Sequence, residues 1–176
     1  MSDSALAPLQ PHQVASLLRA VGTAIQQELI ALPEEFAAWH PAEGEWCIKE
    51  TLGHVIESER RGFAGRIRRI LEADTPALQG WDQVQVARER RDCERPLTDV
   101  LNEFLSQRDD SVRLVAGLKA ADLERGGQHE KVGYLRVQDL LHEWIHHDRN
   151  HFRQILANVQ AAVWPHMANA QRFADE

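Results

Sequence analysis

Apolar residues recur every three or four positions along four stretches of the chain, which is the spacing of an amphipathic helix. The four stretches cover about residues 11–31, 48–72, 96–118 and 137–162. Proline marks their ends, because Pro33 follows the first stretch and Pro96 suits the first turn of the third. Four long helices bury their apolar stripes best side by side, so we expect an all-α fold, a four-helix bundle.

Proline, glycine and polar residues mark the connectors between these helices. The connector at residues 74–95 is longer than a tight hairpin needs, which leaves room for a crossover in place of a strict up-and-down order. A short helical turn is expected in it, around Asp82–Arg90. Residues 120–136 are predicted to be a loop, because Gln128–Val132 and Tyr134–Val137 are too short and too polar to make a sheet.

The length of the chain predicts one domain. Its 176 residues are enough for a single sizeable core, which we place at about residues 12–162 of a domain covering residues 1–176. Charged residues on the outer faces of the second helix, Glu57 and Glu59 among them, are interpreted as a solvated and ion-paired surface.

Charge and composition exclude several classes of function. The net charge of −7 argues against nucleic acid as a general partner, because phosphate binding needs a basic surface. No apolar run approaches the roughly 20 residues of a membrane span, and residues 1–4 lack the features of a secretory signal. With only two cysteines, Cys47 and Cys93, and no Cys-x-x-Cys pair, we expect a cytoplasmic protein without a disulfide framework or a thiolate zinc site.

The last helix is rich in histidine. Four of the nine histidines of the chain lie between residues 140 and 155. His147 and His151 are one helical turn apart and fall within the apolar stripe, whereas His142 and His146 form a neighbouring row nearer the edge of the helix. Two imidazoles one turn apart that point into an apolar interior are a common beginning of a metal site.

His54 is the candidate for a third ligand. It lies in the second helix, one residue from Val55 and close to the inward stripe. A single histidine at such a position is more often a hydrogen-bonded core residue, but a facing pair of histidines favours the role of a ligand. Three neutral imidazoles from two helices suit a divalent ion such as zinc or nickel and leave at least one position to water.

The same residues resemble a known family. Residues 46–54, Trp-Cys-Ile-Lys-Glu-Thr-Leu-Gly-His, resemble the segment Trp-Ser-x-x-Glu-x-x-x-His of DinB-like proteins, and residues 124–129, 138–141 and 147–155 resemble the second half of that family. The resemblance covers about residues 12–160. It implies a four-helix bundle of the DinB/YfiT-like type that binds a divalent metal through His54, His147 and His151.

The resemblance also implies a class of chemistry. Some relatives transfer low-molecular-weight thiols such as bacillithiol or mycothiol, or isomerise compounds with their help, so a thiol is a second expected cofactor. We therefore expect a metal-dependent transferase or hydrolase that activates a small thiol or water against a small-molecule substrate, with Trp144 near the apolar mouth. The alternative is a metal-binding stress-response bundle without catalytic activity. The long helix faces favour a homodimer.

The chain departs from the family at two helix starts. Cys47 stands where the family often has serine, and Leu135 stands where serine or threonine is expected before the last helix. Cys47 is a poor cap, although Glu50 can still reach back to the cap amide. We expect Cys47 to be an inert or mildly reactive thiol, about 10 Å along the helix axis from His54.

Several other side chains are weaker candidates for the site. Glu57 and Ser58 lie one turn beyond His54, where either can serve as a proton carrier or lie on the surface. Gln154 is a candidate for the mouth of the site. Glu50 either orients a ligand or completes a capping box, and His129 either closes over the pocket or is exposed.

Overall fold

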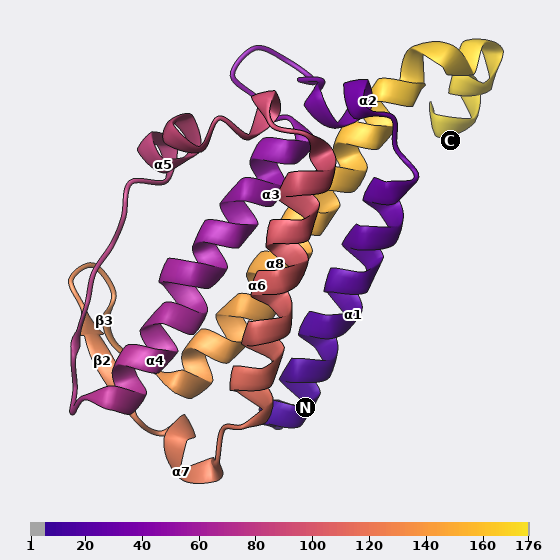
Figure 1. Cartoon of the computed structure of the whole chain (residues 1–176). Helices are drawn as coiled ribbons and strands as arrows, with labels where there is room; N and C mark the ends of the chain where they lie inside the picture. The colour runs from indigo at the N-terminus through magenta and orange to yellow at the C-terminus, as the bar shows by residue number, and fades with distance from the viewer. Residues whose placement is uncertain (1–5, 176) are drawn as a thin grey trace.

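The four predicted helices are present in the computed structural model, which describes residues 6–175 (Figure 1). Their bounds are Pro11–Ile30 for α1, Ile48–Glu57 for α3, Ser58–Phe63 for the π-helix η1, Ala64–Glu72 for α4, Leu97–Ala116 for α6 and Val137–Val163 for α8. α3, η1 and α4 follow one another without a break and together form the second predicted helix. The predicted all-α four-helix bundle is confirmed.

The helices run in the order up, down, down, up. α1 and α8 run in one direction and α3–α4 and α6 in the other, so the connector after α4 crosses the length of the bundle (Figure 1). α6 and α8 each pack against both α1 and α3. The connector carries α5 (Gln83–Arg90) and the short 3-10 helix η2 (Asp92–Glu94). The side chain of Asp82 accepts hydrogen bonds from the first amides of α5, which explains why the expected helical turn forms here.

Residues 120–136 are not a loop, contrary to the sequence-based expectation. They contain the short helix α7 (Ala120–Leu123) and the strands β2 (Gly126–His129) and β3 (Gly133–Arg136). β2 pairs antiparallel with β3 and parallel with β1 (Ala77–Leu78), which gives a three-stranded sheet. The prediction failed because β2 and β3 are short, polar strands that form a local hairpin without an alternating hydrophobic pattern. β1, which completes the sheet, comes from the distant crossover connector.

The remaining short elements lie beside the bundle. α2 (Glu34–Ala38) precedes α3, and the 3-10 segment η3 (Trp164–Asp175) continues the chain beyond α8 (Figure 1). No helix within residues 6–175 is both long and apolar enough to cross a membrane.

The π-helix changes which side chains of the second helix face inward. A π turn holds more residues than an α turn, so the faces after it are shifted relative to a regular 3.6 period. Glu59 lies within η1 and is 0% exposed. Glu57 is the last residue of α3, before the π turn, and is 3% exposed because Arg60, Arg61 and Arg90 surround its carboxylate. Regular spacing placed both glutamates on a solvated surface. The expectation for these two glutamates is therefore wrong, although both are ion-paired.

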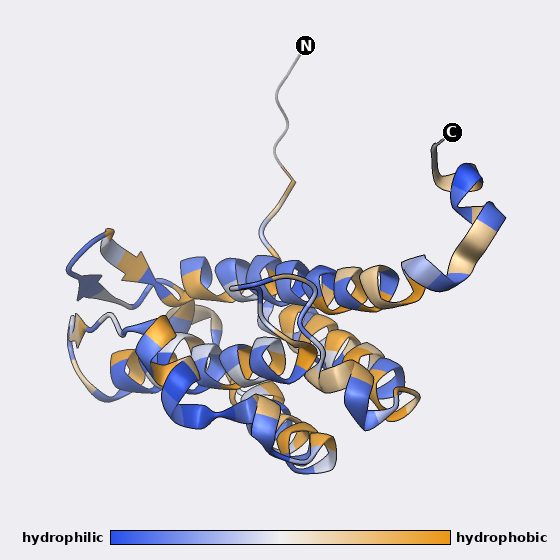
Figure 2. Ribbon diagram, turned by 90° about the horizontal axis from the view of Figure 1, so that it is seen from above, coloured by the Kyte–Doolittle hydropathy of each residue, from blue (hydrophilic) through white to orange (hydrophobic). Residues whose placement is uncertain are grey.

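Hydrophobic residues gather on the helix faces that meet inside the bundle (Figure 2). They form two clusters, one built around Trp144 and Phe63 and the other around Phe104 and Ile155. A layer of buried polar side chains separates the two clusters along the helices, and it contains Arg108 of α6.

Arg108 is held by two carboxylates in this layer. Its guanidinium lies 2.6 Å from Asp148 of α8 and 3.0 Å from Glu59 of η1, and it donates a hydrogen bond to the carbonyl oxygen of Leu18 in α1. All three charged side chains are at most 3% exposed. Buried charges of this kind are tolerated because each is paired, and the pairing fixes three helices and the π turn relative to one another.

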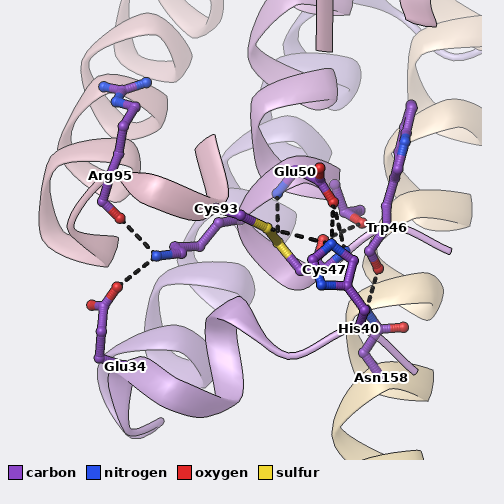
Figure 3. The surroundings of a disulfide bond; sticks show 10 residues. Glu34, His40, Trp46, Cys47, Glu50, Cys93, Arg95 and Asn158 are labelled. Carbon is purple, nitrogen blue, oxygen red and sulfur yellow. Dashed lines mark hydrogen bonds and ion pairs between the residues drawn. A yellow bond between two sulfur atoms is a disulfide. The ribbon is translucent and has the colours of Figure 1, made fainter. Parts of the chain in front are cut away.

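Cys47 and Cys93 are joined by a disulfide (Figure 3). The expectation of a free Cys47 thiol is therefore wrong, and a single disulfide is present where the sequence predicted no disulfide framework. The two cysteines are 46 residues apart, and the crossover connector brings η2 against α3. Gly53 permits this contact, because a Cβ atom at its position would lie 1.8 Å from Oδ2 of Asp92.

We predict that Arg108→Met lowers the free energy of unfolding by about 3–5 kcal/mol, because it leaves the carboxylates of Glu59 and Asp148 buried without a partner. Urea denaturation followed by circular dichroism measures the loss. Arg113→Met is the matched control on the same helix: Arg113 forms an exposed pair with Asp110, and its loss should cost less than about 1 kcal/mol. Equal losses in the two variants would contradict this account of the buried layer.

Candidate metal centre

Three histidines converge where α3 packs against α8. His54 comes from α3, and His147 and His151 come from successive turns of α8. One ring nitrogen from each lies within 4.8 Å of the others, close enough to hold a metal ion. Nε2 of His54 is 3.1 Å from Nε2 of His147, and the rings of His54 and His151 have centroids 4.5 Å apart. The three histidines singled out in the sequence are thus brought together.

The environment keeps these imidazoles uncharged. Burial lowers the pKa of His54 to about 4, helped by the charge of His151. Burial also lowers the pKa of His147 to about 3, with further contributions from His151, His54 and Arg108. The pKa of His151 is lowered by burial as well, although its hydrogen bond with Gln154 opposes the shift. Neutral imidazole is the form that binds a metal ion.

The hydrogen bonds of the rings fit a metal centre. Nδ1 of His151 lies 2.9 Å from the amide oxygen of Gln154. Because that oxygen can only accept, the Nδ1–H group donates and the lone pair of Nε2 is left free for an ion. Nδ1 of His54 and Nδ1 of His147 are buried without a hydrogen-bond partner among the described residues, while their Nε2 atoms face each other. A divalent cation shared by the Nε2 atoms satisfies this arrangement of lone pairs.

Two tryptophans and a serine surround His54. The rings of Trp46 and Trp81 have centroids 5.1 Å and 6.0 Å from the His54 ring, and the Trp81 ring stacks on it. The hydroxyl oxygen of Ser58 lies 3.3 Å from Nε2 of His54. Trp144, expected near the mouth, is instead fully buried and stacks on Phe63. That expectation was wrong because the indole lies on the inward side of α8, within the hydrophobic core.

Trp81, which stacks on His54, also lines two open hollows that the three histidines themselves do not line. The larger measures about 770 Å³ and is lined in addition by Arg66, His129 and Lys131. His129 is 7% exposed on β2, so it is neither a surface residue nor part of a flexible loop. The smaller hollow, of about 270 Å³, is lined by three arginines, Arg61, Arg66 and Arg69.

Glu57 is surrounded by guanidinium groups. Its carboxylate lies 2.6 Å from Arg60, 2.6 Å from Arg61 and 2.9 Å from Arg90. Burial raises its pKa, but the hydrogen bonds and charges of these arginines prevail and the pKa is lowered. The role of Glu57 as a proton carrier stays a prediction. Its ionised carboxylate, paired with three arginines, disfavours that role.

Glu50 completes a capping box. Its carboxylate accepts a hydrogen bond from the amide of Cys47, and its own amide donates to the Cys47 sulfur.

Gln154 orients His151, as described above. His142 bonds to the Leu9 amide and the Gln138 carbonyl, and His146 is exposed and bonds to Asn150, so this row lies apart from the three-histidine cluster.

Sequence reasoning missed Trp81 and Asp148 as neighbours of the site. Trp81 lies in the polar crossover connector, where no periodicity constrains its position; the pair Gly80-Trp81, a large aromatic residue in a polar stretch, was the available signal. Asp148 follows His147 directly, and its partner Arg108 lies 40 residues away, so local pairing rules could not identify it.

We predict that the metal-free protein loses stability as the pH falls below about 6.5. The unfolded chain binds protons on these histidines near pH 6.5, whereas in the folded protein His54 and His147 bind them only near pH 4 and pH 3. The contribution of these histidines to the free energy of unfolding is therefore fully present above pH 6.5. On the order of 2 kcal/mol of it per histidine is lost by pH 5. Urea denaturation between pH 7.5 and pH 5 measures it. His147→Gln should weaken the dependence and His146→Gln should not; an unchanged dependence in His147→Gln would refute the interpretation.

Comparisons with known proteins agree with this architecture. The solved structure of YfiT from Bacillus subtilis, described as a probable metal-dependent hydrolase with an unusual four-helix bundle topology, matches with a TM-score of 0.76 at 16% sequence identity, covering 91% of each chain. Among curated proteins no match is found. The sequence model of the DinB superfamily matches residues 17–155, which is most of the chain. The protein therefore belongs to the DinB superfamily.

Proposed function

We propose that this protein is a divalent-metal-dependent enzyme in which His54, His147 and His151 hold the ion. The observation that carries the proposal is the convergence of three uncharged imidazoles from two helices, one of them buried and two half-buried. Within residues 6–175, no fourth His, Cys, Asp or Glu joins this group. A structural zinc site is normally closed by four protein ligands, whereas a catalytic site has three and keeps a position open. This difference favours an enzyme over the non-catalytic metal-binding bundle.

The donor set suits zinc or nickel, because imidazole is a borderline ligand that both ions accept. When bound, such an ion supplies Lewis acidity that lowers the pKa of a water or thiol nucleophile toward neutrality. Gln154 fixes the ring of His151. The Ser58 hydroxyl, next to Nε2 of His54, would donate or accept a hydrogen bond beside the ion. Trp46 and Trp81 pack against the ring of His54.

The favoured reaction is hydrolysis of a small molecule that carries a negative group. Hydrolysis is the activity named for the structurally similar YfiT. The hollow lined by Arg61, Arg66 and Arg69 adjoins Trp81, and guanidinium groups bind carboxylate or phosphate oxygens in a bidentate manner. Transfer of a small thiol uses the same activated nucleophile, and it is the second reaction that the site supports.

The oxidised protein, with the Cys47–Cys93 disulfide intact, is predicted to bind about one divalent ion per chain. The double variant His147→Ala/His151→Ala should lose it, as measured by elemental analysis after gel filtration. The matched control is His142→Ala/His146→Ala, which removes a pair with the same spacing from the same helix and should keep the ion. Equal metal content in the two double variants would overturn the assignment of the ligands.

Turnover should depend on that ion. We expect the zinc- or nickel-loaded protein to hydrolyse members of a panel of small esters and amides, with a lower KM for acidic members than for neutral ones. The His147→Ala/His151→Ala variant should show no activity above the uncatalysed rate. If only a thiol added to an electrophile reacts in a metal-dependent way, the protein is a transferase. If neither panel reacts and metal loss lowers only the Tm, the non-catalytic bundle is the correct account.

A further inference from the structure

A second group of metal-binding side chains lies at the opposite end of α3 from the π turn. His40 follows α2, Cys47 caps α3, Glu50 lies in the first turn of α3, and Cys93 belongs to η2 (Figure 3). One ligand atom from each of these four residues lies within 4.8 Å of the others. The crossover connector creates this group, because it places η2 against the start of α3.

The four donors face one another at short distances. Nε2 of His40 is 3.1 Å from Oε2 of Glu50 and 3.7 Å from Sγ of Cys93. Sγ of Cys47 lies 3.4 Å from the backbone nitrogen of Glu50, at the N-terminus of α3. A helix N-terminus stabilises a thiolate, which is the form of cysteine that binds metals. The position of Cys47 at the N-cap of α3 therefore favours the thiolate form that a metal ion binds.

We propose that His40, Cys47, Glu50 and Cys93 form a second divalent-metal site, selective for zinc, which exists only when the Cys47–Cys93 disulfide is reduced. Two thiolates, one imidazole and one carboxylate are a tetrahedral zinc donor set. In the disulfide the two sulfurs share a covalent bond and have no thiolate charge to offer an ion. Metal binding and the disulfide therefore exclude each other, and the two forms are the two states of one site.

A two-electron oxidant converts the zinc-bound form to the disulfide form, and a two-electron reductant reverses the reaction. Hydrogen peroxide takes two electrons from the two thiolates, one S–S bond forms, the zinc ion is released, and two protons complete two molecules of water. A phosphine reductant reverses the step: it gives two electrons to the disulfide, gains the oxygen atom of a water molecule, and leaves two thiols. Cys93 lines an open hollow of about 590 Å³, so small reagents can reach it.

This site is separate from the three-histidine centre. Cys47 precedes His54 by seven residues, or about 10 Å along a straight helix. Its donors include sulfur, which the histidine centre lacks. The proposal does not rest on the proposed function, and a spectroscopic signal of sulfur ligation distinguishes the two sites.

Cobalt(II) titration of the full-length protein tests the proposal. The protein is reduced with a phosphine, freed of reductant without air, and titrated with cobalt. We expect a thiolate-to-cobalt charge-transfer band, and about one more bound ion per chain than in the oxidised protein. Hydrogen peroxide should abolish the band and release one ion. A reduced protein without the band, a disulfide that the phosphine cannot reduce, or an ion retained after peroxide would each overturn the proposal.

Variants separate the ligands from their surroundings. Cys93→Ser should abolish the band, and His40→Ala should weaken cobalt binding to the reduced protein by at least about tenfold, the loss typical even of outer-sphere partners. His12→Ala is the control, because His12 is an exposed histidine on α1. Circular dichroism establishes that each variant is folded. A His40→Ala protein that binds cobalt as tightly as His12→Ala would remove His40 from the site.

Discussion

The packing of three uncharged imidazoles, one buried and two half-buried, between α3 and α8 is the constraint on which this structure depends. A charged imidazole is costly to bury, so the site exists only where desolvation holds the rings neutral. The low pKa values of His54 and His147, about 4 and about 3, express this constraint. It requires that α3 and α8 pack side by side, and the crossover and the direction of each helix satisfy that requirement.

The layer of buried polar side chains next to the histidines also helps to keep them uncharged and in place. Asp148, which follows His147, binds Arg108 at 2.6 Å, and the second carboxylate of Arg108 comes from the π-helix. Arg108 adds a positive charge that lowers the pKa of His147 further. The π turn is thus more than an irregularity, because it turns Glu59 inward to complete the ion group that fixes α6 beside the site.

The sequence predicted what depends on local periodicity. The four long helices and the inward pair His147 and His151 follow from a 3.6-residue repeat, and the resemblance to a family added weight to His54. The sheet, the burial of Glu59 and the Cys47–Cys93 pair were missed. The hairpin β2–β3 is too short and too polar to leave a periodic signal. The pairing with β1, the burial of Glu59 and the cysteine pair arise from contacts that the crossover connector or the π turn creates, and these leave no periodic signal either. Trp144 was misplaced for a related reason, because periodicity locates a face of a helix but not the depth of a side chain within the bundle.

X-ray absorption at the zinc edge tests the central claim most directly. The oxidised protein, loaded with one equivalent of zinc, should give a nitrogen or oxygen shell at about 2.0–2.1 Å, with the multiple-scattering pattern of three imidazoles and at least one additional light ligand. Three imidazoles with an open position correspond to His54, His147 and His151. A sulfur shell at about 2.3 Å, or a pattern that requires fewer than two imidazoles, would contradict the account.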